Sequence, residues 1–156
     1  MAEFVMKDLV SKAGLSGEFE IASAAVSSEE LGNPVYPPAA RELSRHGIHC
    51  AGKRARRLTR EDYDLYDLLI AMDRSNLSGM ARICGGDPEG KFSLLLSHAG
   101  RPDEEVADPW YTGNFEATWS DVLSGCEGLL TVLSKQKAPA TTVAGAFLRL
   151  SSSAAF

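Results

Sequence analysis

The stretch Asp67-Leu68-Leu69-Ile70-Ala71-Met72-Asp73 decides the fold that we expect for this chain. Its apolar residues form an unbroken run between two acidic residues, which is typical of a β-strand that is buried on both faces. Residues 75–84 follow with the spacing of a helix, and Gly85 and Gly86 end that helix. A buried strand followed directly by a helix indicates a parallel sheet covered by helices.

The same alternation continues in both directions along the chain. Further strands are predicted at residues 19–24 and 92–96, and further helices at residues 1–13, 38–47 and 115–133, with a short helix opened by a capping box at Thr59. We therefore expect an α/β fold, an open parallel sheet with helices on both faces in three layers. Ligands of such sheets bind at the carboxyl ends of the strands, where Ser23, Asp73 and the loop after Leu96 lie.

The chain divides into a domain and a tail. Residues 1–133 are predicted to form one α/β domain, since this length suits a single core. In the tail, residues 134–139 are polar with one proline, residues 141–150 are apolar and β-prone, and residues 151–156 are low in complexity. We predict that 134–156 is linker-like or disordered, with an edge strand as the alternative.

Composition excludes several classes of function. The net charge of −5 argues against a nucleic-acid binder, because phosphate backbones are bound by basic faces. We interpret the basic run Lys53-Arg54-Ala55-Arg56-Arg57 as a solvated patch. No apolar run is long enough to span a membrane, and the first residues lack the features of a signal peptide. We expect a cytoplasmic protein without a membrane or nucleic-acid partner.

The cysteines are Cys50, Cys84 and Cys126. Their odd number and wide spacing fit neither a disulfide framework nor a zinc site. We therefore expect a reducing compartment, no metal and no cofactor. Cys126 lies on a helical face and is predicted to be a core residue, whereas Cys84 ends a helix with no basic residue near it.

A second informative stretch is Asp108-Pro109-Trp110-Tyr111. Pro109 fixes its own backbone and forces Asp108 into an extended conformation, so the stretch is a loop. An acid on such a loop can protonate a leaving group while the neighbouring rings hold an aromatic substrate. Taken alone, the same residues also fit an ordinary Asp-Pro turn with two rings packed on the core.

Together with the order of strands and helices, short segments along the chain resemble the low-molecular-weight protein tyrosine phosphatases. Each segment is weakly specific alone, but they occur in the family's order from residue 1 to about residue 133. The matching segments are Met1-Ala2-Glu3-Phe4, Ser23-Ala24-Ala25-Val26-Ser27, Gly32-Asn33-Pro34, His46-Gly47-Ile48, Ala55-Arg56-Arg57-Leu58-Thr59-Arg60-Glu61-Asp62-Tyr63, Met72-Asp73-Arg74-Ser75-Asn76-Leu77 and Asp108-Pro109-Trp110-Tyr111.

The resemblance implies two-step phosphoryl transfer through a cysteine held in a Cys-x5-Arg loop. By this resemblance Asp108 is the general acid, and Trp110 and Tyr111 form the wall beside the substrate. Ser16 and Ser23 match serines that support the phosphate loop, and Asp73 has a supporting role near the site. The implied substrate is a phosphotyrosine protein or a small aryl phosphate, and we expect a monomer.

The phosphate loop of the family has no counterpart among these residues. In the family, the Cys-x5-Arg loop and the interior strand before it stand immediately ahead of the equivalent of Met1. We expect that the first strand and the nucleophile are missing from this chain, and that the chain as written is unstable and inactive. Glu29 is a further departure, since an apolar or aromatic residue is expected there to face the substrate.

Alternatives remain open at this point. His49-Cys50-Ala51-Gly52-Lys53-Arg54-Ala55-Arg56 satisfies Cys-x5-Arg, but no buried strand precedes it and no helix starts after the arginine, so we interpret it as fortuitous. Residues 142–148 are a candidate to fill the vacant position in the sheet, which would give a folded, non-catalytic binding module. An arsenate reductase-like relative is the remaining alternative, which the isolated position of Cys84 disfavours.

Overall fold

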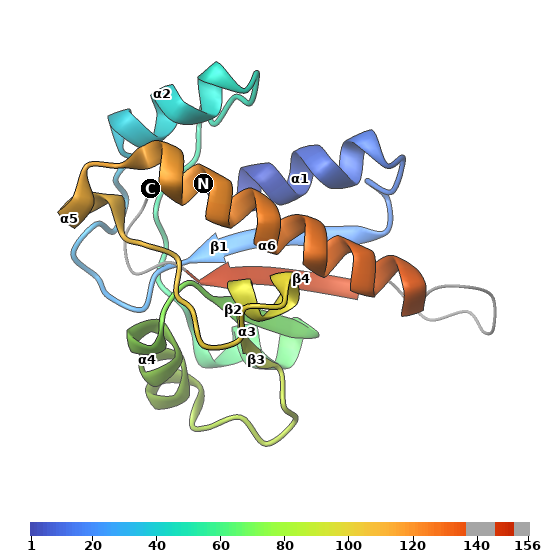
Figure 1. The fold of residues 1–156 in the computed structure, drawn as a ribbon. Helices are drawn as coiled ribbons and strands as arrows, with labels where there is room; N and C mark the ends of the chain where they lie inside the picture. Colours follow the sequence, from blue (N-terminus) through green and yellow to red (C-terminus); the bar gives the residue numbers. More distant parts are fainter. Residues whose placement is uncertain (137–145, 152–156) are drawn as a thin grey trace.

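The computed structural model describes residues 1–136 and 146–151 (Figure 1). Helices and strands alternate along the chain, as the sequence predicts. In order, the elements are α1 (Ala2–Lys12), β1 (Phe19–Ala24), α2 (Pro37–Arg45), α3 (Arg60–Leu65), β2 (Leu68–Ala71), α4 (Arg74–Cys84), β3 (Phe92–Leu94), the 3₁₀-helix η1 (Leu95–Ala99), α5 (Pro109–Thr112), α6 (Phe115–Gln136) and β4 (Ala146–Ser151).

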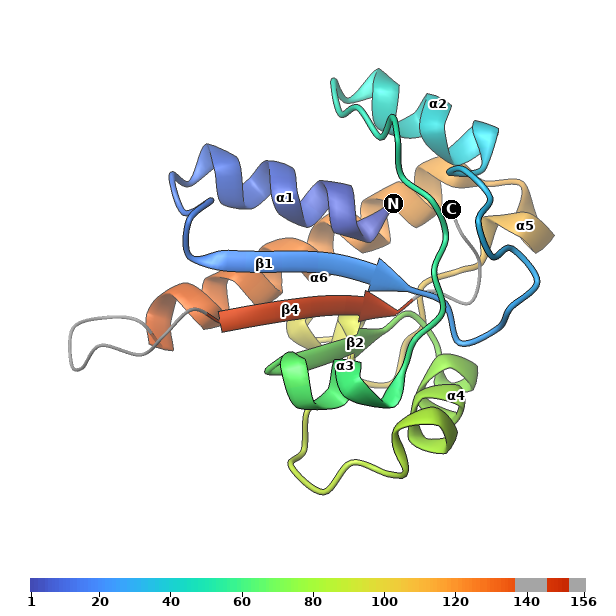
Figure 2. The same cartoon turned by 180° about the vertical axis from the view of Figure 1, so that it is seen from behind.

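β2 lies at the centre of a three-layer fold. Leu69, Ile70 and Ala71 are all 0% exposed to solvent. Ile70 belongs to the hydrophobic cluster that contains residues of α1 and α6, whereas Leu69 and Ala71 belong to the cluster that contains residues of α3 and α4. These helices lie on opposite sides of the sheet in both views (Figures 1 and 2). The predicted α/β class and the burial of this strand on both faces are confirmed.

The sheet has the order β1-β4-β2-β3, and all neighbouring strands are parallel. β4 comes from the tail and lies between β1 and β2, in the interior of the sheet rather than at its edge (Figure 2). This is the interior position for which the sequence predicted no strand. The backbone groups of β1 and β2 that face this position pair with β4. Of residues 142–148, which were the candidate for this position, 146–148 lie in β4 and 142–145 lie outside the described residues. Within the tail, residues 134–136 thus continue α6, and residues 146–151 form a strand.

Three other elements differ from the predicted ones. Pro109–Thr112 form the short helix α5, within a stretch that was predicted to be a loop. α6 continues to Gln136, beyond the domain boundary predicted at residue 133. The strand predicted at 92–96 ends at Leu94, because Leu95 enters η1 instead. In η1, the Leu95 side chain packs so closely on α6 that a methyl group added at Gly125 would lie 2.5 Å from it. Packing against α6 therefore decides the end of β3.

The contact between α6 and η1 predicts a strict size limit at Gly128. A Cβ atom at this position would lie 2.1 Å from the carbonyl oxygen of His98, a backbone atom that cannot rotate away. We expect Gly128→Ala to lower the free energy of unfolding by about 1–3 kcal/mol, measured by urea denaturation. The control is Gly17→Ala, since nothing lies within 4 Å of a Cβ atom there. Equal midpoints for the two variants would contradict this packing.

The interior position of β4 predicts that the fold depends on the tail. A variant that ends at residue 140 leaves the facing edges of β1 and β2 without backbone partners, each unpaired group costing about 1–3 kcal/mol. Since domains are stable by only about 5–15 kcal/mol, we expect this variant to lose its cooperative thermal transition in circular dichroism. A variant that ends at Ser151 keeps β4 and serves as the control. A sharp transition at an unchanged temperature in the shorter variant would show that β4 is dispensable.

Candidate active site

The loop that carries Asp108 is held beside the carboxyl end of β2. The backbone N–H of Val106 donates to the carbonyl oxygen of Met72 at 3.0 Å, and Thr118 Oγ1 of α6 donates to the carbonyl oxygen of Ala107 at 2.9 Å. Asp108 is the N-cap of α5, where its Oδ1 accepts the backbone N–H of Trp110 at 2.8 Å. Asp108 is thus held by a hydrogen bond within its own loop, and the two residues before it are held by Met72 and by α6.

Two exposed aromatic side chains follow this acid. Trp110 is 61% exposed and Tyr111 is 85% exposed, whereas Pro109 between them and Asp108 is buried. The Trp110 ring packs on Tyr36, the N-cap residue of α2, with 5.2 Å between ring centroids. Tyr36 also lies 6.0 Å from the ring of Phe115. The reading of an ordinary turn with both rings in the core does not hold, because these rings stand at the surface.

Sequence reasoning did not find Tyr36. It follows a loop with one glycine and one proline, Gly32 and Pro34, and belongs to no motif. Its one signal is its place just ahead of Pro37, which starts α2.

Asp73 lies at the end of β2 and within electrostatic reach of Asp108. Burial raises the pKa of Asp73, and the carboxylates of Glu105 and Asp108 act in the same direction. The backbone N–H of Asn76, 2.6 Å from Asp73 Oδ1, opposes this rise and makes Asp73 the N-cap of α4. The two aspartates predicted for the site are thus brought together at one edge of the sheet.

Ser23, at the end of β1, is tied to a buried carboxylate. Its hydroxyl donates to Glu3 Oε2 at 2.6 Å, and Lys53 Nζ lies 2.5 Å from the same oxygen. Lys7 binds Oε1 of Glu3 at 2.6 Å. Burial acts to raise the pKa of Glu3, but the hydrogen bonds from Lys53, Lys7 and Ser23 outweigh it, so the pKa lies below its ordinary value.

This network corrects the interpretation of the basic run as a solvated patch for Lys53 and Arg56, whereas Arg54 and Arg57 are exposed. Lys53 is paired with Glu3, and Arg56 Nη1 is paired with Asp62 Oδ2 at 2.9 Å. Glu3 itself was missed, although one signal exists: it shares a helical face with the buried residue Met6, three positions further on.

The comparisons with known proteins agree on one family. A sequence model of the family described as low molecular weight phosphotyrosine protein phosphatase matches residues 1–139. The chain belongs to this family. The low molecular weight protein-tyrosine-phosphatase YfkJ of Bacillus subtilis is 36% identical over 138 residues, which is 88% of each protein. A low molecular weight phosphotyrosine protein phosphatase of Drosophila melanogaster is 35% identical over 81% of this chain and 76% of its own length.

Solved structures give the same fold. The crystal structure of YfkJ superimposes with a TM-score of 0.83 at 35% identity, covering 88% of this chain and 87% of that one. The crystal structure of a low molecular weight protein tyrosine phosphatase from Streptococcus pyogenes superimposes with a TM-score of 0.74 at 32% identity, covering 85% and 82%. The family and the three-layer fold that the sequence predicts are therefore confirmed.

Ser16 does not join the other predicted site residues of this phosphatase. It is exposed in the turn between α1 and β1, at the amino end of β1, whereas Ser23 lies near the carboxyl end. An extended strand of this length separates its two ends by roughly 17–20 Å. The expectation that both serines support one phosphate loop is corrected, because they occupy opposite ends of the same strand.

The three cysteines lie outside any phosphate-binding cradle among the described residues. Cys50 is half-buried in a turn, and the chain that follows it is extended, with isolated bridges at Arg54 and Arg57. Arg56, the arginine of the Cys-x5-Arg match, is engaged by Asp62. Cys84 and Cys126 are buried; burial raises the pKa of Cys84 and raises that of Cys126 to about 12. None of these thiols meets the requirements of an activated nucleophile.

Within residues 1–136 and 146–151, no group of three or more His, Cys, Asp or Glu side chains is placed to hold a metal ion. Over the same residues, no helix has both the length and the apolar character to cross a membrane.

The Glu3 network predicts a pH-dependent stability. Because the pKa of Glu3 is lower in the folded than in the unfolded chain, its contribution is complete above the ordinary value of 4.5 and is lost as the pH falls through the folded value. We expect Glu3→Gln to lower the free energy of unfolding at pH 7 by about 1–3 kcal/mol, with a smaller difference at pH 3. Urea denaturation at both pH values measures this.

The matched control for Glu3→Gln is Glu127→Gln, an exposed carboxylate on α6. We expect this control to follow the pH dependence of the unaltered protein. A loss at pH 7 that stays constant down to pH 3 would mean that Glu3 acts through packing and not through its charge.

Proposed function

We propose that Asp108 is the general acid of a phosphotyrosine phosphatase site, and that the 156-residue chain by itself does not turn over aryl phosphates. The observation that carries the proposal is the placement of Asp108 as the N-cap of α5, directly ahead of the exposed rings of Trp110 and Tyr111. When Trp110 and Tyr111 hold the phenyl ring of an aryl phosphate, the oxygen that joins this ring to phosphorus lies near the Asp108 carboxyl group. Membership in a phosphatase family makes a phosphorylated protein the substrate class, and phosphotyrosine is the form that suits the aromatic wall.

Asp108 transfers a proton in each of the two steps of the reaction. As the bond between phosphorus and the phenol oxygen breaks, the Asp108 carboxyl gives its proton to that oxygen, so that phenol and not phenolate leaves. The resulting carboxylate then takes a proton from the water that hydrolyses the cysteinyl phosphate. The resemblance assigns the attacking thiolate to a Cys-x5-Arg loop, and the match at Cys50 lacks the helix and the free arginine that such a loop needs.

The two alternative functions, a non-catalytic binding module and an arsenate reductase-like relative, receive unequal support from the structure. A folded, non-catalytic binding module draws support from β4, because the interior of the sheet is filled without a phosphate loop. An arsenate reductase-like relative needs accessible relay thiols, and the burial of Cys84 and Cys126 gives it no support. A cytoplasmic location and a monomeric state remain part of the proposal.

Two proteins test the proposal by hydrolysis of phenyl phosphate and p-nitrophenyl phosphate. We expect the 156-residue chain to release no phosphate. A chimera that lacks residues 146–156, and that carries a relative's strand and Cys-x5-Arg loop ahead of Met1, is expected to hydrolyse both compounds. In the chimera, Asp108→Asn is expected to lower kcat for phenyl phosphate by about 10²–10⁴-fold, and less for p-nitrophenyl phosphate, whose phenolate leaves without a proton.

The matched control in the chimera is Asp103→Asn, because Asp103 is an exposed carboxylate of the same loop. It is expected to leave both rates unchanged. Turnover by the 156-residue chain would refute the inactivity, and an Asp108→Asn chimera as fast as its parent on phenyl phosphate would refute the role of the acid.

A further inference from the structure

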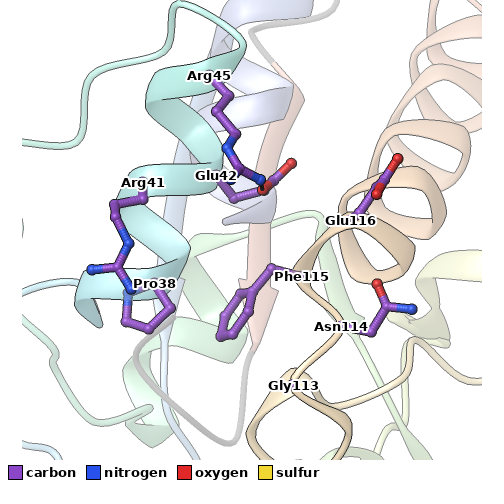
Figure 3. Close-up of a pocket in the computed structure, with 8 residues that line it drawn as sticks. All are labelled: Pro38, Arg41, Glu42, Arg45, Gly113, Asn114, Phe115 and Glu116. Atoms are coloured by element: carbon purple, nitrogen blue, oxygen red, sulfur yellow. Dashed lines mark hydrogen bonds and ion pairs between the residues drawn. The ribbon is translucent and has the colours of Figure 1, made fainter.

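A pocket of about 320 Å³ lies between α2 and the start of α6 (Figure 3). Pro38 and Arg41 form part of its wall on α2, and Phe115 and Glu116 form part of its wall on α6. In Figure 3 the Phe115 ring lies toward α2, with Pro38 and Arg41 on one side of it and Glu116 on the other. The pocket therefore combines an apolar surface with charged groups on opposite walls.

The charges on the α2 wall are not equivalent. Glu42 is buried and already neutralised, since it accepts Arg45 Nη1 at 2.9 Å and lies 3.2 Å from His46 Nε2. Arg41 is exposed, and no hydrogen bond or ion pair to another described residue engages its guanidinium. The positive charge that this wall offers to a ligand is therefore that of Arg41.

The opposite wall carries Glu116, which lies in the first turn of α6. The N-terminal end of a helix bears a partial positive charge, which offsets part of the charge of a carboxylate in this turn. An acidic group that enters the pocket thus meets Arg41 on the α2 wall, while the Phe115 ring separates it from Glu116.

The pocket adjoins the proposed catalytic loop through a row of aromatic rings. Phe115 lines the pocket and lies 6.0 Å from Tyr36, and Tyr36 lies 5.2 Å from Trp110. Arg41 follows Tyr36 on α2 by about 8 Å along the helix axis at 1.5 Å per residue. This places Arg41 on the order of 10 Å beyond the aromatic wall, a distance that about three extended peptide residues span.

We propose that this pocket binds an acidic side chain of a phosphotyrosine peptide, about three residues from the phosphotyrosine, and that Arg41 selects it. The guanidinium offers a carboxylate a bidentate pair, and the Pro38 and Phe115 surface takes the methylene groups of a glutamate. The substrate class is thus an acidic phosphotyrosine segment. This inference rests on the proposed function, because it assumes that the phosphotyrosine ring lies against Trp110.

Binding of two fluorescein-labelled peptides to the 156-residue chain tests the inference. Both carry one phosphotyrosine, flanked on either side at the third position by glutamate in one peptide and by lysine in the other. Fluorescence anisotropy gives the ratio of the two dissociation constants. We expect the acidic peptide to bind more tightly, and Arg41→Glu to change the ratio by about tenfold in favour of the lysine peptide, with a smaller change at high salt.

The matched control is Arg82→Glu, since Arg82 is also an exposed arginine near the end of a helix, on α4. It alters the net charge equally, and it is expected to leave the ratio unchanged. A ratio that shifts as much in the control as in Arg41→Glu would overturn the proposal, because the effect would then be one of net charge. An acidic peptide that does not bind measurably, or a ratio that Arg41→Glu leaves unchanged, would also overturn it.

The outcomes separate this inference from the proposed function. Asp108 is tested on small aryl phosphates, which have no flanking residue to reach Arg41. If Asp108→Asn has no effect in the chimera while Arg41 still sets the peptide preference, the role of the acid fails and the pocket remains. If Asp108 acts as expected and the peptide ratio ignores Arg41, the pocket alone is rejected.

Discussion

The position between β1 and β2 is the constraint on which the rest of the structure depends. Both strands present backbone N–H and C=O groups to this position, and buried groups of this kind must find partners. β4 supplies those partners along its whole length: Ser151 pairs in register with Ala24 of β1 and with Ala71 of β2. Ala24 and Ala71, the last residues of β1 and β2, therefore lie at the same level of the sheet. Ser23 and Asp73 lie near one edge of the sheet because of this registration.

The loop that carries Asp108 depends in turn on the carboxyl ends of these strands. It follows η1, and three described contacts fix it close to Asp108: the Val106 hydrogen bond to Met72, the Arg74 side chain 3.2 Å from Glu105, and the Thr118 hydroxyl that donates to the carbonyl oxygen of Ala107. The first two contacts are at the junction of β2 and α4, and the third comes from α6. The position of Asp108 thus depends both on α6 and on the strand end that carries Asp73, and the Asp108 carboxylate acts to raise the pKa of Asp73.

The sequence predicted those elements whose causes are local. The apolar run at β2, the alternation at β1 and the capping residue Asp62, which accepts the backbone N–H of Thr59 at 3.0 Å, act within a few residues. The family segments placed Asp108, Trp110 and Tyr111 next to one another, but the predicted loop is wrong from Pro109 to Thr112, which form α5 with Asp108 as its N-cap.

The features that sequence reasoning missed have causes elsewhere in the chain. β3 ends early because Leu95 packs on α6, some thirty positions later in the sequence. Lys53 is not solvated because Glu3, far from it in sequence, needs a partner when buried. Ser16 was assigned through the family resemblance, although the strand predicted at residues 19–24 already placed it ahead of β1 and Ser23 near the other end.

The charge of the whole protein makes recognition of an acidic peptide a local matter. A net charge of −5 repels such a peptide at long range, so overall attraction cannot supply the affinity. At physiological ionic strength, however, exposed charges are screened beyond about 8 Å, and only charges close to the bound peptide act on it. Within that range, the paired Glu42 contributes little, because Arg45 already neutralises it. An unpaired arginine beside the aromatic wall then decides which peptides are accepted, even on an acidic protein.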